Sequence, residues 1–162
     1  MDIVHTILPL KNEMYRLALR ITLNSQEAED VVQDVVIRLW QMRERLDGID
    51  NIEAYALRMT RNLALDRSRM RVNQTESLED ITPPAVTTHD ELEADERIDI
   101  VRQLMQQLPE KQRTCMHLRD FDGHTYREIA DITGLSEEQV KVSIHRARQF
   151  IKVRLQADNG MV

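Results

Sequence analysis

The sequence predicts an all-α protein made of two small helical domains joined by a flexible acidic linker. Glycine and proline are scarce, with four of each in 162 residues, and they fall near segment edges. Apolar residues recur at intervals of three and four, the spacing of one face of a helix. The pattern stops after residue 71 and resumes near residue 90. We therefore expect domains at residues 1–71 and 90–157, with a linker at residues 72–89 and a helix-turn-helix in the second domain.

Three helices are expected in the amino-terminal domain. The second follows a cap at Ser25, and the third begins at Asn51, a residue type that caps helices well. Gly48 separates these two helices. Each helix carries one apolar stripe that should face a shared core. The stripes are Leu10, Met14, Leu17, Ala18 and Ile21; Ala28, Val31, Val32, Val35, Val36, Leu39 and Trp40; and Ile52, Tyr55, Ala56, Met59 and Leu63.

The linker is polar and contains a Pro-Pro pair, without any helical periodicity. This composition is typical of an extended or disordered connector. Residues 72–97 hold eight acidic side chains and one basic side chain, so the local charge is −7. Helical spacing returns near Asp90 and stops at Pro109, because proline cannot continue a helix. A short segment then leads into the last two helices.

Two capped helices joined by a glycine form the predicted helix-turn-helix. Thr125 stands three residues before Glu128, and Ser136 stands three before Gln139, so each pair can close a capping box. Gly134 lies between the helices and can adopt the left-handed backbone that ends the first one. The second helix carries an apolar stripe of Val140, Ile144, Ala147, Ile151 and Leu155.

The outer face of that second helix is basic. Residues 141–154 contain five lysine or arginine side chains and no acid, although the whole chain has a net charge of −6. A solvated basic face is the simpler interpretation of a charge run. However, a helix-turn-helix places the front of its second helix in the major groove and needs cations for phosphate. Residues 58–71 form a second basic cluster, with a net charge of +4. The sequence thus predicts DNA binding.

Other classes of function find little support in the sequence. No apolar run approaches the roughly 20 residues that span a bilayer, and the amino terminus does not resemble a signal peptide, so we expect a cytoplasmic protein. The single cysteine, Cys115, cannot form an intramolecular disulfide, and its spacing from His117 is a weak metal signal. We expect no metal, no cofactor, no small-molecule substrate and no enzymatic activity.

Three segments, in order, resemble the bacterial RNA polymerase sigma factors of the extracytoplasmic-function (ECF) group. Residues 28–40 (AEDVVQDVVIRLW) resemble the segment that binds the clamp helices of core polymerase. Residues 55–71 resemble the segment that reads and melts the minus-ten promoter element, and residues 108–148 resemble the domain that reads the minus-thirty-five element. The resemblance implies core polymerase and promoter DNA, both duplex and melted strand, as partners. It also implies an anti-sigma factor, often membrane-bound.

The resemblance assigns roles to individual residues. The side chains that would bind polymerase are Asp30, Gln33, Asp34 and Arg38. Those that would hold the melted minus-ten strand are Arg58, Arg61, Asn62, Arg67 and Arg69, with the loop at residues 47–51 as the candidate pocket for splayed bases. Those that would contact the minus-thirty-five element are Ser136, Glu138, Gln139, Lys141, Val142, Ser143, His145, Arg146 and Arg148.

The recognition helix departs from the family pattern. The family usually shows Lys-Ser-Arg in the middle of that helix, whereas this chain has Lys141, Val142 and Ser143. A long donor is therefore missing, and the base preference of relatives does not transfer. Aromatic side chains are also scarce, and Tyr15, Trp40 and Tyr55 fit core stripes better than a platform for stacking bases.

Two alternatives remain at this point. A self-sufficient helix-turn-helix regulator would bind duplex DNA tightly without polymerase. A helical adaptor with merely solvated basic faces would show no dependence on DNA. The net charge of −6 favours a protein that binds naked DNA weakly and borrows affinity from a partner.

Overall fold

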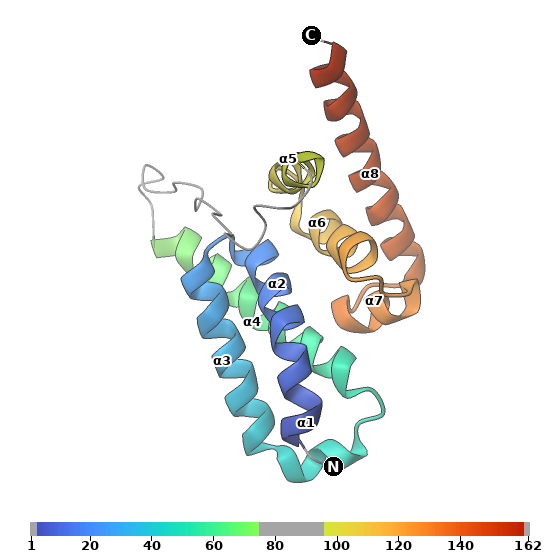
Figure 1. Cartoon of the computed structure of the whole chain (residues 1–162). Coiled ribbons are helices and arrows are strands. Elements are labelled where there is room, and N and C mark those ends of the chain that lie inside the picture. The colour runs from blue at the N-terminus through green and yellow to red at the C-terminus, as the bar shows by residue number, and fades with distance from the viewer. Residues whose placement is uncertain (1–2, 75–95, 161–162) are drawn as a thin grey trace.

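The computed structural model describes residues 3–74 and 96–160, and within them it forms helices and no strand (Figure 1). The prediction of an all-α fold is confirmed. The first group of helices comprises α1 (Ile3–Ile7), η1 (Leu8–Leu10), α2 (Lys11–Thr22), α3 (Ser25–Gln41), η2 (Arg43–Gly48) and α4 (Ile52–Gln74). The second comprises α5 (Glu96–Met105), α6 (Glu110–Met116), the π-helical segment η5 (His117–Phe121), α7 (Tyr126–Thr133) and α8 (Glu137–Gly160).

Two helices run further than the sequence suggested. Helix α4 continues to Gln74, three residues past the predicted end of its domain, and α8 continues to Gly160, three residues past the predicted end of the second domain at residue 157. Neither extension contains a proline, and the only glycine is the terminal one. The remainder of the predicted linker, residues 75–89, and the predicted helix start at Asp90 lie outside the described residues.

Helix α2 is the centre of the amino-terminal bundle. Its predicted stripe is confirmed, since all five residues are buried. The helix ends at Leu23, which adopts the left-handed conformation with φ 55°. Asn24 then caps α3, accepting a hydrogen bond from the Glu27 amide at 2.9 Å. The predicted cap at Ser25 is therefore wrong by one residue, because Asn24 is the residue with extended backbone and Ser25 already lies in the helix.

The stripe of α3 is buried as predicted, except at its end. Val35 and Leu39 are fully buried, but the Trp40 side chain is 50% exposed and does not belong to the core. At about 100° of rotation per residue, Trp40 lies within about 20° of Gln33 and about 100° from Leu39. Its place is therefore on the outer face of α3.

Helix α4 begins as expected, with Asn51 accepting a hydrogen bond from the Ala54 amide at 3.1 Å. Ile52 and Ala56 are buried, and Tyr55 packs against the same core. Tyr15, on α2, packs there too, as the sequence predicts.

Both capping boxes of the helix-turn-helix are confirmed. Thr125 and Glu128 exchange side-chain to backbone hydrogen bonds at 2.9 and 3.1 Å, and Ser136 and Gln139 do the same at 2.9 and 3.1 Å. Gly134 takes φ 78°, the left-handed angle that glycine adopts without steric cost. These local signals fix the angle between α7 and α8. The predicted stripe of α8 is buried from Val140 to Ile151, with Leu155 partly buried.

The two bundles pack directly against each other. Helix α7 contacts α4, and α6 and η5 contact α2. Side chains of the second bundle join the apolar cluster of the first; they are Cys115, Leu118, Ile129, Ile132, Val140 and Ile144. A smaller apolar cluster lies between α5, α6 and α8. The described parts of the chain thus form one closed unit.

Leu39 and Ile37 provide a matched test of the α3 assignment. Leu39→Ala should lower the free energy of unfolding by about 2–5 kcal/mol, because the side chain is fully buried and its removal leaves a cavity. Ile37→Ala should change it by less than about 0.5 kcal/mol, because Ile37 is 54% exposed. Urea denaturation followed by circular dichroism measures both values. Equal effects of the two changes would contradict the orientation of α3.

Candidate nucleic-acid and protein interfaces

The exposed face of α8 carries five of the predicted minus-thirty-five residues. They occur at spacings of three, four, seven and eight, so they share one side of the helix, opposite the buried stripe. These residues, here called the α8 face, are Glu138, Lys141, Val142, His145 and Arg146. Val142 is the apolar member and is exposed. A helix that begins with a capping box therefore presents cations, a carboxylate, an imidazole and one apolar side chain together.

Ser143 does not share the α8 face. Its side chain is half-buried and its hydroxyl hydrogen-bonds the thiol of Cys115, which lies on α6 and is fully buried. Burial raises the pKa of that thiol to about 11. The position that carries arginine in the usual family pattern thus points toward α6 in this chain. Ser136 and Gln139 are exposed but are used in the capping box that starts α8.

Arg148, the last of the predicted minus-thirty-five residues, is held by a carboxylate. Its Nε lies 3.0 Å from Oδ2 of Asp120, and its Nη2 contacts the other oxygen of the same group. Asp120 belongs to η5, so the pair ties the middle of α8 to the segment before the helix-turn-helix. Both side chains keep some solvent exposure. A phosphate approaching Arg148 would have to compete with Asp120.

The predicted polymerase-binding residues of α3 lie in two rows. Asp30 and Asp34 face α4, where Arg67 contacts their Oδ2 atoms at 3.4 and 2.9 Å. Arg38 is exposed and continues the row of the two aspartates, four residues after Asp34, whereas Gln33 is exposed on the outer side of α3. The structure therefore joins two predicted sites, because Arg67 was assigned to the minus-ten strand.

An exposed stripe beside Gln33 was missed by the sequence reasoning. Ile37 and Trp40 follow Gln33 at intervals of four and seven residues, and they are 54% and 50% exposed. The Arg43 guanidinium lies 4.3 Å from the centre of the Trp40 ring and donates to the Trp40 carbonyl oxygen at 2.9 Å. We call Gln33, Ile37 and Trp40 the α3 stripe. Its signal was the seven-residue spacing from Gln33 to Trp40.

The predicted minus-ten residues of α4 divide into exposed and sequestered side chains. Arg58, Asn62 and Arg69 are exposed. Arg61 was assigned to the same strand, but it is only 9% exposed and points into the contact between the two bundles. Helix α7 covers that part of α4, so Arg61 is not on the exposed surface that its assigned role requires. The candidate loop at residues 47–51 includes the last two residues of η2, a segment that is anchored by buried Leu46.

Comparisons with known proteins agree with this arrangement. Residues 7–74 match the family model of Sigma-70 region 2, and residues 98–151 match that of Sigma-70, region 4. The ECF RNA polymerase sigma factor SigL of Mycobacterium tuberculosis is 30% identical over 88% of this chain and 82% of its own. This chain belongs to the ECF RNA polymerase sigma factors. The ECF sigma factor SigW of Bacillus subtilis is 29% identical over 90% of this chain and 84% of its own.

Two solved structures share the fold of this sigma factor. The sigma factor RpoE, in complex with the anti-sigma factor NepR from Bartonella quintana, superposes with a TM-score of 0.82 over 97% of this chain and 98% of that one, at 21% identity. CnrH, in complex with the cytosolic domain of CnrY, has a TM-score of 0.68 over 96% of this chain and 88% of that one, at 18% identity. Both superpositions cover the two bundles together.

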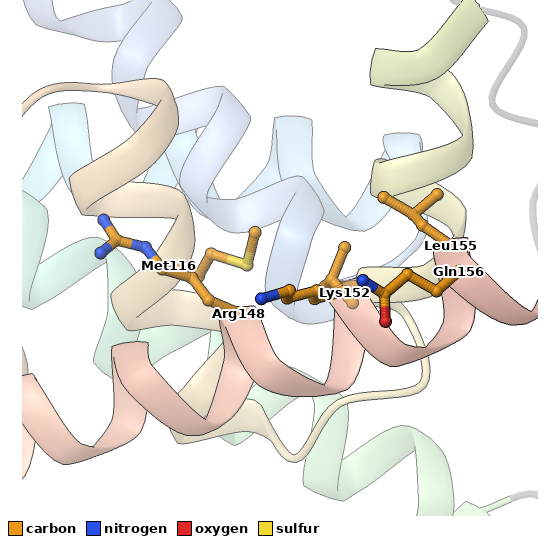
Figure 2. A pocket seen from close by; sticks show the side chains of 6 residues that line it. Met116, Arg148, Lys152, Leu155 and Gln156 are labelled. Atoms are coloured by element: carbon orange, nitrogen blue, oxygen red, sulfur yellow. The ribbon is translucent and has the colours of Figure 1, made fainter.

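A shallow hollow lies along the later part of α8 in this sigma factor, with a volume of about 350 Å³ (Figure 2). Its lining is mostly apolar and contains no carboxylate, thiol or imidazole; the lining residues are Met116, Arg148, Ile151, Lys152, Leu155 and Gln156.

Metal and membrane signals are equally weak in the part of the chain that the structure describes. No group of three or more potential metal ligands comes together in residues 3–74 and 96–160. Cys115 and His117 are both buried, on α6 and η5. None of the described helices is both long and apolar enough to cross a membrane.

Two histidines of the second bundle lie at its contact with α2. Nε2 of His124 contacts the Glu13 carboxylate of α2, and its Nδ1 lies 3.5 Å from Glu128. The hydrogen bond to Glu13, with help from Glu128, raises the pKa of His124 above its ordinary value of 6.5. His117 is almost wholly buried, and burial lowers its pKa although Asp122 lies 3.1 Å away.

The His124 pair makes a pH-dependent contribution to stability that can be measured. Because the folded pKa is raised, the contribution should be fully present below about pH 6.5 and should be lost as the pH rises through the raised pKa. NMR titration should give a His124 pKa above 6.5, and Glu13→Gln should lower it. Glu44→Gln, an exposed change on η2, is the control and should leave it unchanged. A His124 pKa at or below 6.5 would contradict the contact with α2.

Proposed function

We propose that this sigma factor binds core RNA polymerase through α3 and directs it to a subset of promoters through α4 and α8. The observation that carries the proposal is the pair of basic surfaces on separate bundles, one on α8, the second helix of the helix-turn-helix, and one along α4. A chain with net charge −6 gains little from the general attraction of duplex DNA. This charge distribution fits two local DNA contacts that act when polymerase supplies the rest of the binding free energy.

The α3 stripe supports the polymerase contact. An exposed tryptophan beside an exposed isoleucine is unusual on a solvated helix, and aromatic anchors dominate the energy of many protein interfaces. Gln33 lies in the same stripe, and Asp30 and Asp34 lie on the neighbouring row toward α4. We assign the centre of the contact to Ile37 and Trp40, with Gln33, Arg38 and the two aspartates around it.

The α8 face supports contact with the minus-thirty-five element. Lys141 and Arg146 can donate to guanine or phosphate oxygens, and Glu138 can accept from cytosine N4. Val142 can contact a thymine methyl group. We do not assign Ser143 to base recognition, because its hydroxyl is hydrogen-bonded to the thiol of Cys115. The base preference then depends on Glu138, Lys141, Val142 and His145 rather than on position 143.

The exposed residues of α4 support contact with the minus-ten strand. Arg58 and Arg69 can hold phosphates, and Asn62 can bond a base edge. Arg61 and Arg67 carry the same chemistry but are engaged by carboxylates in the closed unit. They can join the surface only after those ion pairs exchange.

One experiment separates this proposal from its alternatives. Purified chain is added to core polymerase, and promoter-specific transcription is measured on genomic DNA fragments. The proposal expects initiation at defined start sites that depends on the added chain. Tight binding of the chain alone to duplex DNA, without transcription, would instead support a self-sufficient helix-turn-helix regulator. No dependence on DNA in either assay would support a helical adaptor.

Trp40→Ala should weaken binding to core polymerase by about tenfold or more, because removing a central aromatic anchor commonly costs about 2 kcal/mol or more. Gln26→Ala, an exposed change at the other end of α3, is the matched control. Binding is measured by fluorescence anisotropy of labelled chain titrated with core polymerase. If Trp40→Ala binds as tightly as the control, the α3 stripe is not the contact.

Lys141→Ala should weaken promoter engagement by about 1–3 kcal/mol, because Lys141 lies centrally on the α8 face. The readout is the concentration of polymerase holoenzyme that gives half-maximal initiation. Lys111→Ala removes the same charge from an exposed position on α6 and should have little effect. Equal effects of the two lysine changes would indicate only general charge attraction.

The likeness to a solved sigma factor also supports an anti-sigma factor as a partner of this chain. The RpoE structure that shares this fold contains the anti-sigma factor NepR. We assign to this chain an inhibitor protein of that kind, which binds the free sigma factor and blocks transcription with core polymerase. Attachment of such an inhibitor to a membrane remains a prediction.

A further inference from the structure

Val142 is the apolar side chain of the α8 face, and it lies near the centre of that face. Glu138 stands one turn before it and His145 one turn after it, and at about 100° per residue both lie within about 60° of Val142 around the helix axis. The Val142 side chain is 43% exposed. An exposed, branched apolar residue therefore stands between a carboxylate and an imidazole on the helix assigned to DNA.

Contacts with other elements hold the residues on either side of Val142. The Lys141 ammonium lies 5.7 Å from the centre of the Tyr126 ring, at the start of α7, a distance at which cation–π attraction acts. The Ser143 hydroxyl bonds the buried thiol of Cys115 on α6. Lys141 and Ser143 are thus both directed toward other elements of the protein, one on each side of α8. Val142 points outward between them, opposite the buried stripe.

The base edges in the major groove offer one kind of apolar group to such a side chain. Thymine carries a methyl group at C5, whereas the purines and unmodified cytosine present hydrogen-bond donors and acceptors. A valine pressed against a donor or acceptor removes its water without replacing the hydrogen bond, which disfavours that base. A valine therefore favours a pyrimidine methyl group and disfavours a polar edge.

Glu138 places a carboxylate beside this apolar contact. Residues four apart are neighbours on a helix surface, with about 5–6 Å between their β-carbons. A carboxylate accepts a hydrogen bond from N4 of cytosine, the atom attached next to C5. With Glu138 on that amino group, Val142 is within reach of C5 on the same base or on the base pair beside it.

We propose that Val142 determines specificity at the minus-thirty-five element by packing against the C5-methyl group of a pyrimidine in the major groove. This inference rests on the proposed contact of α8 with that element. The methyl group belongs to thymine or to a cytosine methylated at C5, since both present it at the same place in the groove. Serine, which the family usually shows at this position, can bond polar edges of any base, whereas valine can bond none.

The test uses holoenzyme formed from the full chain and core polymerase, with a promoter library randomised over the minus-thirty-five region. The selected promoters define the element. Each thymine in it is then replaced by deoxyuridine, which lacks only the methyl group. At one thymine this replacement should weaken holoenzyme binding by about fourfold, the effect of one buried methyl group. If the base is a cytosine, 5-methylcytosine should instead strengthen binding by about the same factor.

Substitutions of two exposed valines assign the methyl response to a residue. Val142→Ala should abolish the response, because the shorter side chain does not reach the methyl group. Val153→Ala shortens a second exposed valine of α8, about 16 Å further along the helix, and should leave the response intact. Val142→Ser should relax the choice of base at that one position when the selection is repeated.

Several results would overturn the role of Val142. They are a wild-type holoenzyme that responds to no C5-methyl group of the element, a response that persists in Val142→Ala, and a response lost equally in Val153→Ala. An unchanged base choice in Val142→Ser would do the same. Initiation at defined promoters without a methyl response would overturn this inference alone. No promoter-specific initiation by the wild-type chain would overturn the proposed function, and this inference with it.

Discussion

The burial of the second half of α2 on every side is the constraint on which the rest of the molecule depends. Six consecutive residues of α2, from Leu17 to Thr22, are buried, whereas a surface helix buries only one stripe. One side of α2 packs on α3 and α4, and another packs on α6 and η5. The second bundle is therefore part of the environment that α2 requires. Separating the bundles must expose apolar surface of α2, and this cost has to be offset by binding to polymerase or DNA.

Features that depend on neighbouring residues in the chain could be predicted from the sequence. Both capping boxes, the left-handed Gly134 and the apolar stripes of α2 and α8 follow from local spacing, and the structure confirms them. The sequence did not predict the direction in which the side chains of Arg61, Ser143 and Trp40 face. Arg61 and Ser143 are oriented by helices far away in sequence, α7 and α6, and no local pattern records that contact. Trp40 was misplaced because apolar character was taken as evidence of burial.

Arginines assigned to DNA are repeatedly held by carboxylates of the same chain. Glu110 holds Arg61, Asp30 and Asp34 hold Arg67, and Asp120 holds Arg148. Each pair orders a long, flexible side chain in a defined position and also lowers its attraction for free phosphate. In the proposed function, promoter binding would then be an exchange of one anion for another, with a small net gain in free energy per contact. Such exchange favours sites at which several contacts form together, as they do when polymerase holds the DNA in place.

The thiol of Cys115, on α6, is fully buried and hydrogen-bonded to the hydroxyl of Ser143 on α8. With a pKa of about 11, it is almost entirely protonated near neutral pH, and the thiolate is the form that reacts with oxidants. It is also the single cysteine of the chain. The closed sigma factor therefore keeps its one thiol in a form and a place that peroxides and disulfides react with poorly, so Cys115 is not suited to sense oxidants.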